Sequence, residues 1–289
     1  MQAMVSRHKP RRKKIKPLWI AVTVLFAIYT VVLVAPYVYG FLVSIETDFE
    51  FQNSIFPHPR TFKISNYLAA WKDLSSEETS VIMMFVNSLW FSVGTTVVGL
   101  FYATTAAYVV SKYRFPMRKF IFSFALVMMM VPIIGGMASN LKFTSALGGY
   151  NSPLYVFINA QTLGGSFIII VSCFNAVDWG YAEAAYIDGA GHFSVFFRVM
   201  LPQLVSPLCA LALTDFIMFW ADTDTALIYF PNLPTLSTGL YLYQDVVERL
   251  YNYPVYYAGL ITCMIPSIVL FSVFQKSLMD IQMGGGLKG

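Results

Sequence analysis

Long apolar stretches separated by short polar segments run through most of this 289-residue chain. A helix needs about 20 mostly apolar residues to cross the roughly 30 Å hydrocarbon layer of a bilayer, and six stretches reach that length. The predicted spans cover residues 18–43, 81–111, 117–138, 152–177, 201–223 and 254–278. The fourth is the weakest, because Gln161, Gly164 and Gly165 interrupt it. The pattern predicts an all-α integral membrane protein with six transmembrane helices.

The composition supports a membrane protein and gives no sign of catalysis. Only 12% of the residues are charged and 57% are hydrophobic, whereas soluble domains carry about twice that charged fraction. Cys173, Cys209 and Cys263 lie in apolar runs without the spacing of a metal site or a disulfide framework. The sequence has no phosphate-binding loop, nucleophile elbow or HExxH motif. We therefore expect no cofactor, metal or catalytic residue in this chain.

The positions of Lys and Arg predict how the spans are oriented. Seven of them fall in the segment 7–16, and the linker after the second predicted span holds Lys112, Arg114, Arg118 and Lys119. The segment 45–80 instead has six acids against three bases. We expect a multi-pass protein of the cell (cytoplasmic) membrane with both termini in the cytoplasm.

This orientation divides the chain into three parts. Residues 1–17 would be a basic cytoplasmic tail, 18–280 the transmembrane domain and 281–289 a cytoplasmic C-terminal tail. The basic tail is typical of an anchor that faces membrane lipid, and no nucleic acid is expected as a partner.

One stretch on the predicted cytoplasmic side, EAAYIDGAGHFSVFFRVMLPQLVSP (183–207), differs from its surroundings. Tyr181, Ala185, Asp188 and His192 fall on one stripe of an ideal helix, at steps of four, three and four. Small residues between them would let another surface approach the backbone closely. The pattern indicates a short helix with an acidic face, although an ordinary amphipathic loop helix would give the same pattern.

Glycine and proline predict where this short helix ends. Gly189 and Gly191 can end or bend it, and Pro202 suits the first turn of the next span, where its missing N–H costs little. The whole element would cover about residues 181–200 and lie below the bilayer.

The same stretch resembles the EAA signature of ABC importer permeases. The matching positions are Glu183, Ala184, Ala185, Asp188, Gly189, Ala190, Phe196, Leu201, Pro202 and Pro207. The spacing EAAxxDGAxxxxxFxxxxLPxxxP is similar to the variant of the carbohydrate family, whose members depend on a binding protein for sugar import. Weaker similarity continues over most of the chain, for example in FKISNYLAAW (62–71) and PTLSTGLY (234–241).

The resemblance implies a type I ABC importer permease that forms half of a translocation path for a carbohydrate, with an oligosaccharide favoured. The implied partners are a second homologous permease subunit in a heterodimer, a dimer of ATPase subunits and an extracytoplasmic solute-binding protein. The chain would not be an enzyme, because the ATPase subunits would bind ATP and Mg²⁺ and carry out hydrolysis.

The resemblance also assigns residues to the contact with the ATPase. The implied coupling residues are Glu183, Ala184, Ala185, Asp188, Gly189, Ala190, Leu201 and Pro202. The two acids can accept charge-assisted hydrogen bonds from Arg or Lys of the partner, and the small residues permit close docking.

Acidic residues in and beside the fifth predicted span are the best candidates for a substrate path. Asp215 and Asp222 are seven residues apart and would face the same way on a helix, and an intramembrane acid is costly unless it faces a cavity or a partner. Trp220 would offer a flat face to a sugar ring, and Asp224 follows nearby. Alternatively, Asp215 pairs with another helix while Asp222 and Asp224 lie at the outer water boundary. Many carbohydrate permeases have Trp-Asn here, whereas this chain has Trp220-Ala221.

Other function classes fit the sequence less well. A self-contained secondary transporter would carry charge relays or inverted repeats, and a scaffold that only holds partners would not need intramembrane acids. Within the resembling family, a permease for a non-sugar solute is the alternative.

Overall fold

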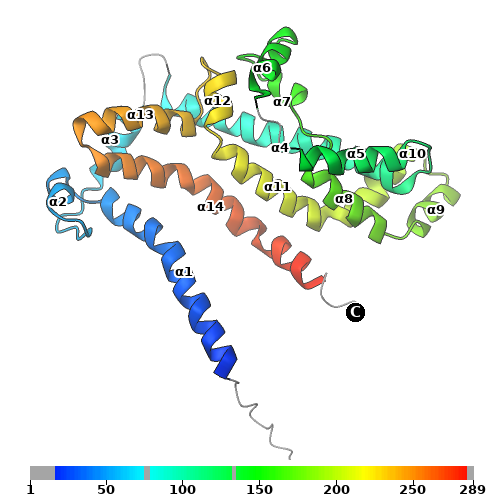
Figure 1. Ribbon diagram of the computed structural model, residues 1–289, viewed down its shortest axis with the longest axis horizontal. Helices are drawn as coiled ribbons and strands as arrows, with labels where there is room; N and C mark the ends of the chain where they lie inside the picture. The colour runs from blue at the N-terminus through cyan, green and yellow to red at the C-terminus, as the bar shows by residue number, and fades with distance from the viewer. Residues whose placement is uncertain (1–16, 75–78, 132–134, 285–289) are drawn as a thin grey trace, which may run out of the picture.

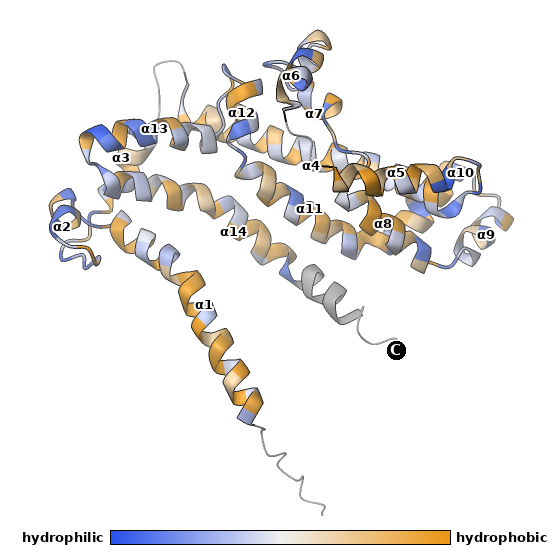
Figure 2. Cartoon of the chain, in the orientation of Figure 1, coloured by the Kyte–Doolittle hydropathy of each residue, from blue (hydrophilic) through white to orange (hydrophobic). Residues whose placement is uncertain are grey.

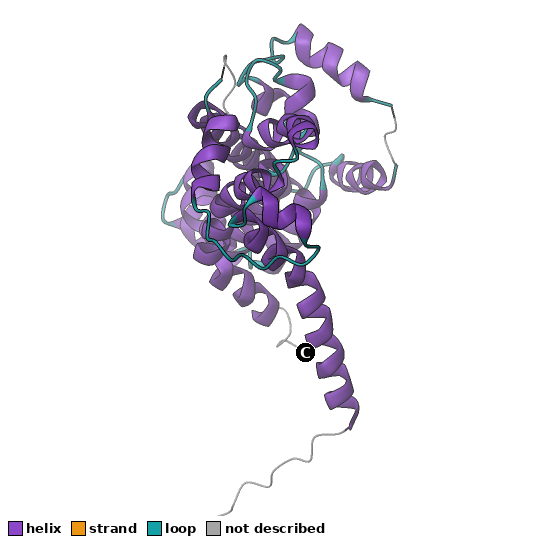
Figure 3. Ribbon diagram, turned by 90° about the vertical axis from the view of Figure 1, so that its left-hand side faces the viewer, coloured by secondary structure: helices purple, strands orange, loops and turns teal. Residues whose placement is uncertain are grey.

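The computed structural model describes residues 17–74, 79–131 and 135–284, and from residue 276 on only the backbone. Every regular element within these ranges is a helix, which confirms the predicted all-α class (Figures 1 and 3). The predicted basic tail lies almost wholly outside the described residues, as do residues 285–289 of the predicted C-terminal tail. The last helix continues to Gly284 and so includes the start of that tail.

Within the described ranges, four helical segments are long and apolar enough to cross a membrane. They are α1 (Pro17–Ser44), α4 (Val81–Lys112), α14 (Tyr253–Gly284) and a continuous run, His192–Trp220, that contains α11 (Val205–Trp220). They match the first, second, sixth and fifth predicted spans. A fifth candidate is the pair α8 (Gly165–Ala176) and α9 (Gly180–Ile187), which is bent by 69°.

The third and fourth predicted spans correspond to shorter helices. α5 (Arg118–Met130) has 13 residues, about 20 Å of helix, and α6 (Met137–Ala146) follows as a separate element. The fourth predicted span is divided into α7 (Tyr155–Ile158) and α8, because Gly164 takes an extended conformation directly before α8. Six full spans are therefore not confirmed in the part of the chain that is described.

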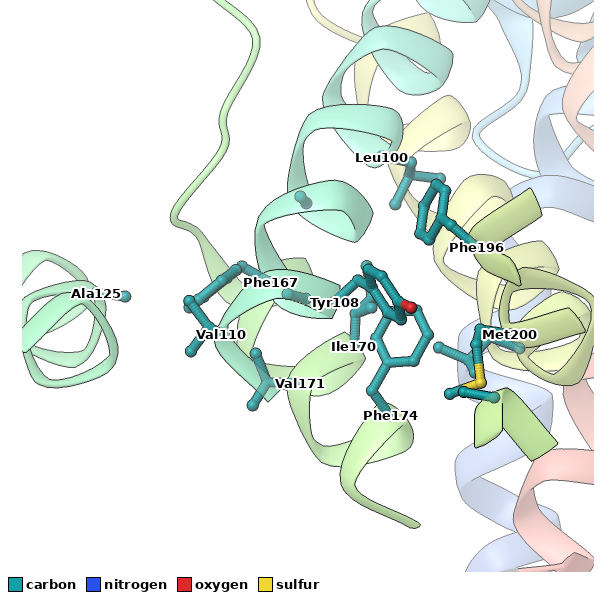
Figure 4. Packing of buried hydrophobic residues seen from close by; sticks show 14 of the residues in the cluster. Leu100, Tyr108, Val110, Ala125, Phe167, Ile170, Val171, Phe174, Phe196 and Met200 are labelled. Atoms are coloured by element: carbon teal, nitrogen blue, oxygen red, sulfur yellow. The ribbon is translucent and has the colours of Figure 1, made fainter. Parts of the chain in front are cut away.

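α4 lies at the centre of the bundle, where it packs against α8 and α11, while α14 packs against α11, α1 and α3 (Ser65–Asp73). One buried cluster joins α4, α8 and the segment before α11, with Tyr108, Phe174 and Phe196 among its members (Figure 4). A second cluster joins α3, α4, α13 (Leu236–Leu250) and α14. The bundle thus has two separately packed ends. They are called here the α9–α10 end, after α9 and α10 (His192–Ser194), and the α3–α13 end.

α1 leaves the bundle and is covered only near its C-terminus (Figure 1). A Cβ atom added at Gly40 would lie 3.2 Å from the ring of Tyr257 on α14, so the two helices approach closely there. Most other side chains of α1 are apolar and exposed (Figure 2). In a membrane protein, such a surface faces lipid or another subunit.

Short helices close the α3–α13 end. α2 (Asp48–Asn53) begins with a capping box. The Glu50 backbone N–H donates to the Thr47 hydroxyl, and the Thr47 backbone N–H donates to the Glu50 carboxylate. α12 (Asp224–Tyr229) and α13 follow α11 along the chain. Figure 1 shows α2, α3 and α13 at one end of the long axis and α9 and α10 at the other.

Candidate functional site

The α9–α10 segment starts with a sharp bend after α8, which hydrogen bonds hold in place. Lys112 Nζ, at the end of α4, donates to the carbonyl oxygen of Val177 at 2.6 Å. The Asp178 carboxylate accepts from the backbone N–H of Gly180 at 2.8 Å, which satisfies a free donor at the start of α9. Ala182 is fully buried against the bundle. The first half of α9 is therefore fixed to the membrane-spanning part.

α9 ends in a backbone turn that requires glycine. Gly189 N–H donates to the Tyr186 carbonyl at 3.0 Å, and Ala190 N–H donates to the Ala185 carbonyl at 2.9 Å. This pair of bonds is the Schellman motif, which satisfies carbonyls at the helix end. Gly189 has φ = +83°, a conformation that glycine adopts without steric cost. α9 thus ends at the first of the two glycines that the sequence singled out.

The helix that follows this turn begins earlier than predicted. α10 (His192–Ser194), the π-helical segment η1 (Val195–Met200), the 3₁₀ segment η2 (Leu201–Leu204) and α11 form one run. The Leu201 N–H donates to the Phe196 carbonyl, five residues back. The widened turn precedes Pro202, which lacks an N–H and whose ring clashes with the preceding turn of a regular α-helix. The prediction that Pro202 opens this helix is wrong, because Pro202 lies inside it.

Buried aromatic side chains join this helical run to the bundle (Figure 4). Val195, Phe196 and Met200 are buried, and the ring of Tyr108 on α4 lies 4.9 Å from that of Phe196. Tyr108 also lies 5.3 Å from Phe174 on α8. Because interiors are closely packed, a displacement of the segment would be transmitted to α4 and α8.

His192 joins the two arms of the turn. Its Nδ1 lies 2.9 Å from the Tyr186 hydroxyl on α9 and 3.2 Å from the Tyr113 hydroxyl, directly after α4. The prediction that His192 and Asp188 share one helical stripe is therefore wrong. His192 lies on the second helix and contacts the first from across the turn.

The outer surface of the α9–α10 segment carries acids and apolar side chains. Glu183, Ala184 and Asp188 are exposed, and neither acid has an ion-pair partner among the described residues. Ile187 and Phe193 are 86% and 83% exposed, although neither was predicted from the sequence as a functional residue. The signal was present, since two large apolar residues flank the glycine turn in a segment predicted to lie outside the bilayer.

The candidate path residues on α11 have partners within the chain. Asp215 is partly buried and its carboxylate lies near the Ser166 side chain at the start of α8. Trp220 is 6% exposed: its Nε1–H donates to the Cys263 carbonyl at 2.9 Å, and its ring stacks on Phe216. The Trp220 ring is thus almost completely covered, which leaves little of it for a sugar.

Asp222 and Asp224 lie beyond the end of α11. The prediction that Asp215 and Asp222 share one helical face is therefore wrong. The Asp222 carboxylate accepts the backbone N–H of Thr225 at 3.0 Å and caps the start of α12. Asp224 is exposed in the first turn of α12, where a negative charge complements the helix dipole. The two residues therefore lie at the junction of α11 and α12, and the alternative that places them at the outer water boundary stays a prediction.

A groove of about 390 Å³ lies between α11, α13 and α14. Its lining residues include Thr223, Tyr241 and Gln244, together with Trp220 and apolar residues of α11, α13 and α14. Asp215, Asp222 and Asp224 are not among its lining residues. This groove could not be predicted from the sequence, because three separate helices form it.

Comparisons with known proteins agree with the helical architecture. The sequence profile of the binding-protein-dependent transport system inner membrane component matches residues 95–279. A probable ABC transporter permease protein of Bacillus subtilis is 28% identical over 296 residues, covering 100% of this chain and 94% of the relative. The maltodextrin transport system permease protein of Bacillus subtilis is 30% identical over 220 residues, covering 74% and 78% of the two chains.

A solved structure has the same fold. One chain of a bacterial ABC transporter involved in the import of the acidic polysaccharide alginate superposes with a TM-score of 0.74 at 20% identity. The superposition covers 94% of this chain and 99% of the other.

Proposed function

Because the chain belongs to the inner membrane components of binding-protein-dependent transport systems, we propose that it is one permease subunit of an ATP-driven importer for a carbohydrate, with an oligosaccharide favoured. The protein is embedded in the membrane. The second half of the path comes from a homologous permease subunit, the solute from an extracytoplasmic binding protein, and the energy from a dimer of ATPase subunits that binds ATP and Mg²⁺. This chain itself hydrolyses nothing.

The main support for this proposal is the outer surface of the α9–α10 segment. Its acids and its two exposed apolar side chains point out of the chain, while its other face is buried against α4 and α8. A surface of this kind suits a protein partner that supplies basic groups and an apolar cleft. The helical run from His192 to Trp220 then links the docking surface to the interior of the membrane domain.

The coupling roles divide according to where the residues lie. Glu183 and Asp188 bind bases of the ATPase, Ala184 allows close approach, and Gly189 maintains the turn. Ala185 and Ala190 supply the two ends of the turn's hydrogen bond. Leu201 and Pro202 act in the helical run that carries the movement inward.

The substrate path is proposed at two places. Asp215 lies within the membrane domain, where an ionisable side chain indicates function, and the groove beside Trp220 presents hydroxyl and amide groups that can bind sugar hydroxyls. Asp222 and Asp224 contribute at the path's outer boundary. In this proposal six segments cross the membrane, α5–α6 and α7–α8 completing the third and fourth crossings, with both termini in the cytoplasm.

Carbohydrate is favoured over other solutes because the maltodextrin permease is 30% identical to this chain, and the solved structure of the same fold comes from an alginate importer. The alternative is a related importer for a non-sugar solute. A self-contained secondary transporter is the remaining rival, and the outward acids and apolar side chains of the α9–α10 segment have no role in it.

The test is purification of the tagged chain from its native host, followed by reconstitution. We expect a second permease and an ATPase to co-purify, and ATP hydrolysis in proteoliposomes to rise when the sugar-loaded binding protein is added on the outside. Screening that binding protein against oligosaccharides and non-sugar solutes separates the two substrate classes. Solute uptake by the chain alone, driven by an ion gradient without ATP, would contradict the proposal.

The predicted orientation needs its own test. Single cysteines replacing Arg118 and the exposed Lys72 should react with an impermeant reagent from opposite sides, with position 118 protected in intact cells. Labelling of position 118 from outside would place the α9–α10 segment on the wrong side for an ATPase.

A further inference from the structure

A cavity of about 420 Å³ lies between the end of α4, the start of α5 and the end of α8. Its lining residues are Val110, Arg118, Lys119, Phe122, Val171 and Asn175. Val110 and Val171 are buried at its apolar part and lie on the side of α4 and α8 that faces α5 (Figure 4). The cavity therefore combines an apolar floor with a polar rim of two cations and an amide.

The two cations of this rim have no acidic partner among the described residues. The Arg118 side chain is partly buried, so solvent compensates its charge incompletely. α5 has no acid in its first turn and no side-chain cap at its start. Positive side chains at a helix N-terminus are opposed by the helix dipole, so an anion in the cavity would neutralise an unfavourable arrangement.

The cavity lies where the apolar surface of the bundle gives way to basic residues. Lys112 is the last residue of α4, a helix of membrane-spanning length. Phe120 and Phe124 on α5 are exposed and stack with their rings 5.9 Å apart. A ligand with an anionic head and an apolar tail would contact both kinds of surface at once.

We propose that this cavity binds the phosphate group of an anionic phospholipid. Arg118 donates a forked pair of hydrogen bonds to the phosphate oxygens, Lys119 adds a second positive charge, and Asn175 donates to a phosphate or ester oxygen. The first part of an acyl chain packs on Phe122 and the two valines. Basic pockets between membrane helices bind lipid headgroups in this way. The lipid ties α5 to α4 and α8, and thus to the residues that hold the α9–α10 segment.

Placing this lipid in the cytoplasmic leaflet rests on the proposed function, whereas phosphate binding at the cavity does not. The probe is phosphatidylglycerol in nanodiscs made with phosphatidylcholine. Native mass spectrometry of the released complex reports which adducts remain bound, and their masses distinguish phosphatidylglycerol from inorganic phosphate. The test variant is Arg118→Gln combined with Lys119→Gln. The matched control is Arg114→Gln, which removes one charge from the same linker at an exposed position that does not line the cavity.

We expect the parent and Arg114→Gln to retain phosphatidylglycerol equally, and the double variant to lose it by about tenfold or more, since charged hydrogen bonds to the phosphate are lost. Undiminished phosphatidylglycerol in the double variant would overturn the proposal, as would an equal loss in Arg114→Gln. Adducts with the mass of free phosphate alone would overturn the assignment to a lipid. Because lipid retention is read without transport, an absent ATPase subunit would count against the proposed function and leave this test intact.

Discussion

At the α3–α13 end, buried polar side chains bond to groups of helices that are distant in sequence, whereas the acidic side chains of the α9–α10 segment point out of the protein. Asn87 Nδ2 on α4 donates to the Pro234 carbonyl, and Ser88 accepts from the Leu236 N–H before α13. The Tyr243 hydroxyl donates to Asp73. Glu183 and Asp188, by contrast, have no ion-pair partner among the described residues.

The difference shows how the two ends are held. Side-chain hydrogen bonds close the α3–α13 end by itself, so its geometry needs no other subunit. The α9–α10 end takes its shape from a backbone turn, from the hydrogen bonds of Lys112, Asp178 and His192, and from the residues buried beneath it. Its exposed acids are not used in these bonds and are available to a partner. In the proposed function this end transmits movement to the ATPase, which requires its outer surface to stay free.

The largest expected effect comes from breaking the turn at the α9–α10 end. In Gly189→Val, a β-branched residue would have to adopt φ = +83°, which costs about 1–2 kcal/mol even for an ordinary residue. We expect uptake to be lost and co-purification of the ATPase to fall, with the permease still inserted in the membrane. Uptake by reconstituted proteoliposomes and subunit stoichiometry are the measurements.

The matched control for that variant is Gly191→Val. Gly191 has φ = −76° and, like Gly189, nothing within 4 Å of an added Cβ atom. The Gly191→Val variant should therefore keep most of the uptake activity. Equal losses in the two variants would mean that added bulk on the docking surface is responsible, and the argument from the turn would fail.

The next effect tests whether exposed apolar residues differ in role between the two ends. Phe193→Ser should weaken ATPase association by about ten- to hundredfold, because a buried Phe side chain contributes about 1.5–3 kcal/mol. Phe56 lies beside α2 and is 80% exposed, and Phe56→Ser should leave ATPase association unchanged. The affinity of the ATPase for the detergent-solubilised permease pair measures both. An intact affinity in Phe193→Ser would remove this residue from the docking surface.

A smaller effect is expected within the membrane domain. Asp215→Asn keeps the size of the side chain and removes its charge, and we expect uptake to fall about tenfold, or ~1.4 kcal/mol. Asp222→Asn should stay close to the parent, since an amide oxygen still caps α12. Initial uptake rates at equal membrane abundance decide. Parent-like uptake in Asp215→Asn would mean that the charge of Asp215 has no role in the path.

These variants also mark what the sequence could predict. The glycine turn was predictable because Gly189 lies in a short run of small residues, and helix C-termini favour glycine there. The four long helices were predictable from their apolar length. Both features are encoded locally, within one turn or one helix.

Features that depend on several helices could not be predicted. Pro202 was placed at a helix start because proline favours that position, but a π-helical turn accommodates it inside a longer helix. Trp220 was interpreted as a sugar platform because no single-sequence pattern indicates that Phe216 and the Cys263 carbonyl cover it. Gly164 and Gly165 indicated a break in the fourth predicted span, but they did not predict that the span divides into two separate helices, α7 and α8.

The smallest effect concerns a buried acid at the α3–α13 end. Glu46 is 1% exposed; one carboxylate oxygen accepts the His58 backbone N–H, and the other has no partner among the described residues. Burial raises the pKa of Glu46 above its ordinary value of 4.5, Glu50 adds to the rise, and the His58 N–H opposes it. A raised folded-state pKa means that protonation stabilises this end, and that the stabilisation is lost as the pH rises through that pKa.

Glu46→Gln keeps the acceptor for His58 and replaces the unpaired oxygen with a neutral amide. The variant should therefore be at least as stable as the parent near neutral pH, and its midpoint of thermal unfolding should change less between about pH 5 and 8. Glu50→Gln is the control: hydrogen bonds lower the pKa of the Glu50 carboxylate, chiefly from the Thr47 backbone N–H, so their stabilisation is present above the ordinary pKa of 4.5 and is lost as the pH falls. Removing the carboxylate should therefore destabilise the protein near neutral pH and change the pH dependence only on the acid side. A pH slope unchanged in Glu46→Gln would show that another group titrates at this end. Since neither residue lies near the α9–α10 segment, ATPase association should be the same in both variants, and a loss in either would contradict the independence of the two ends.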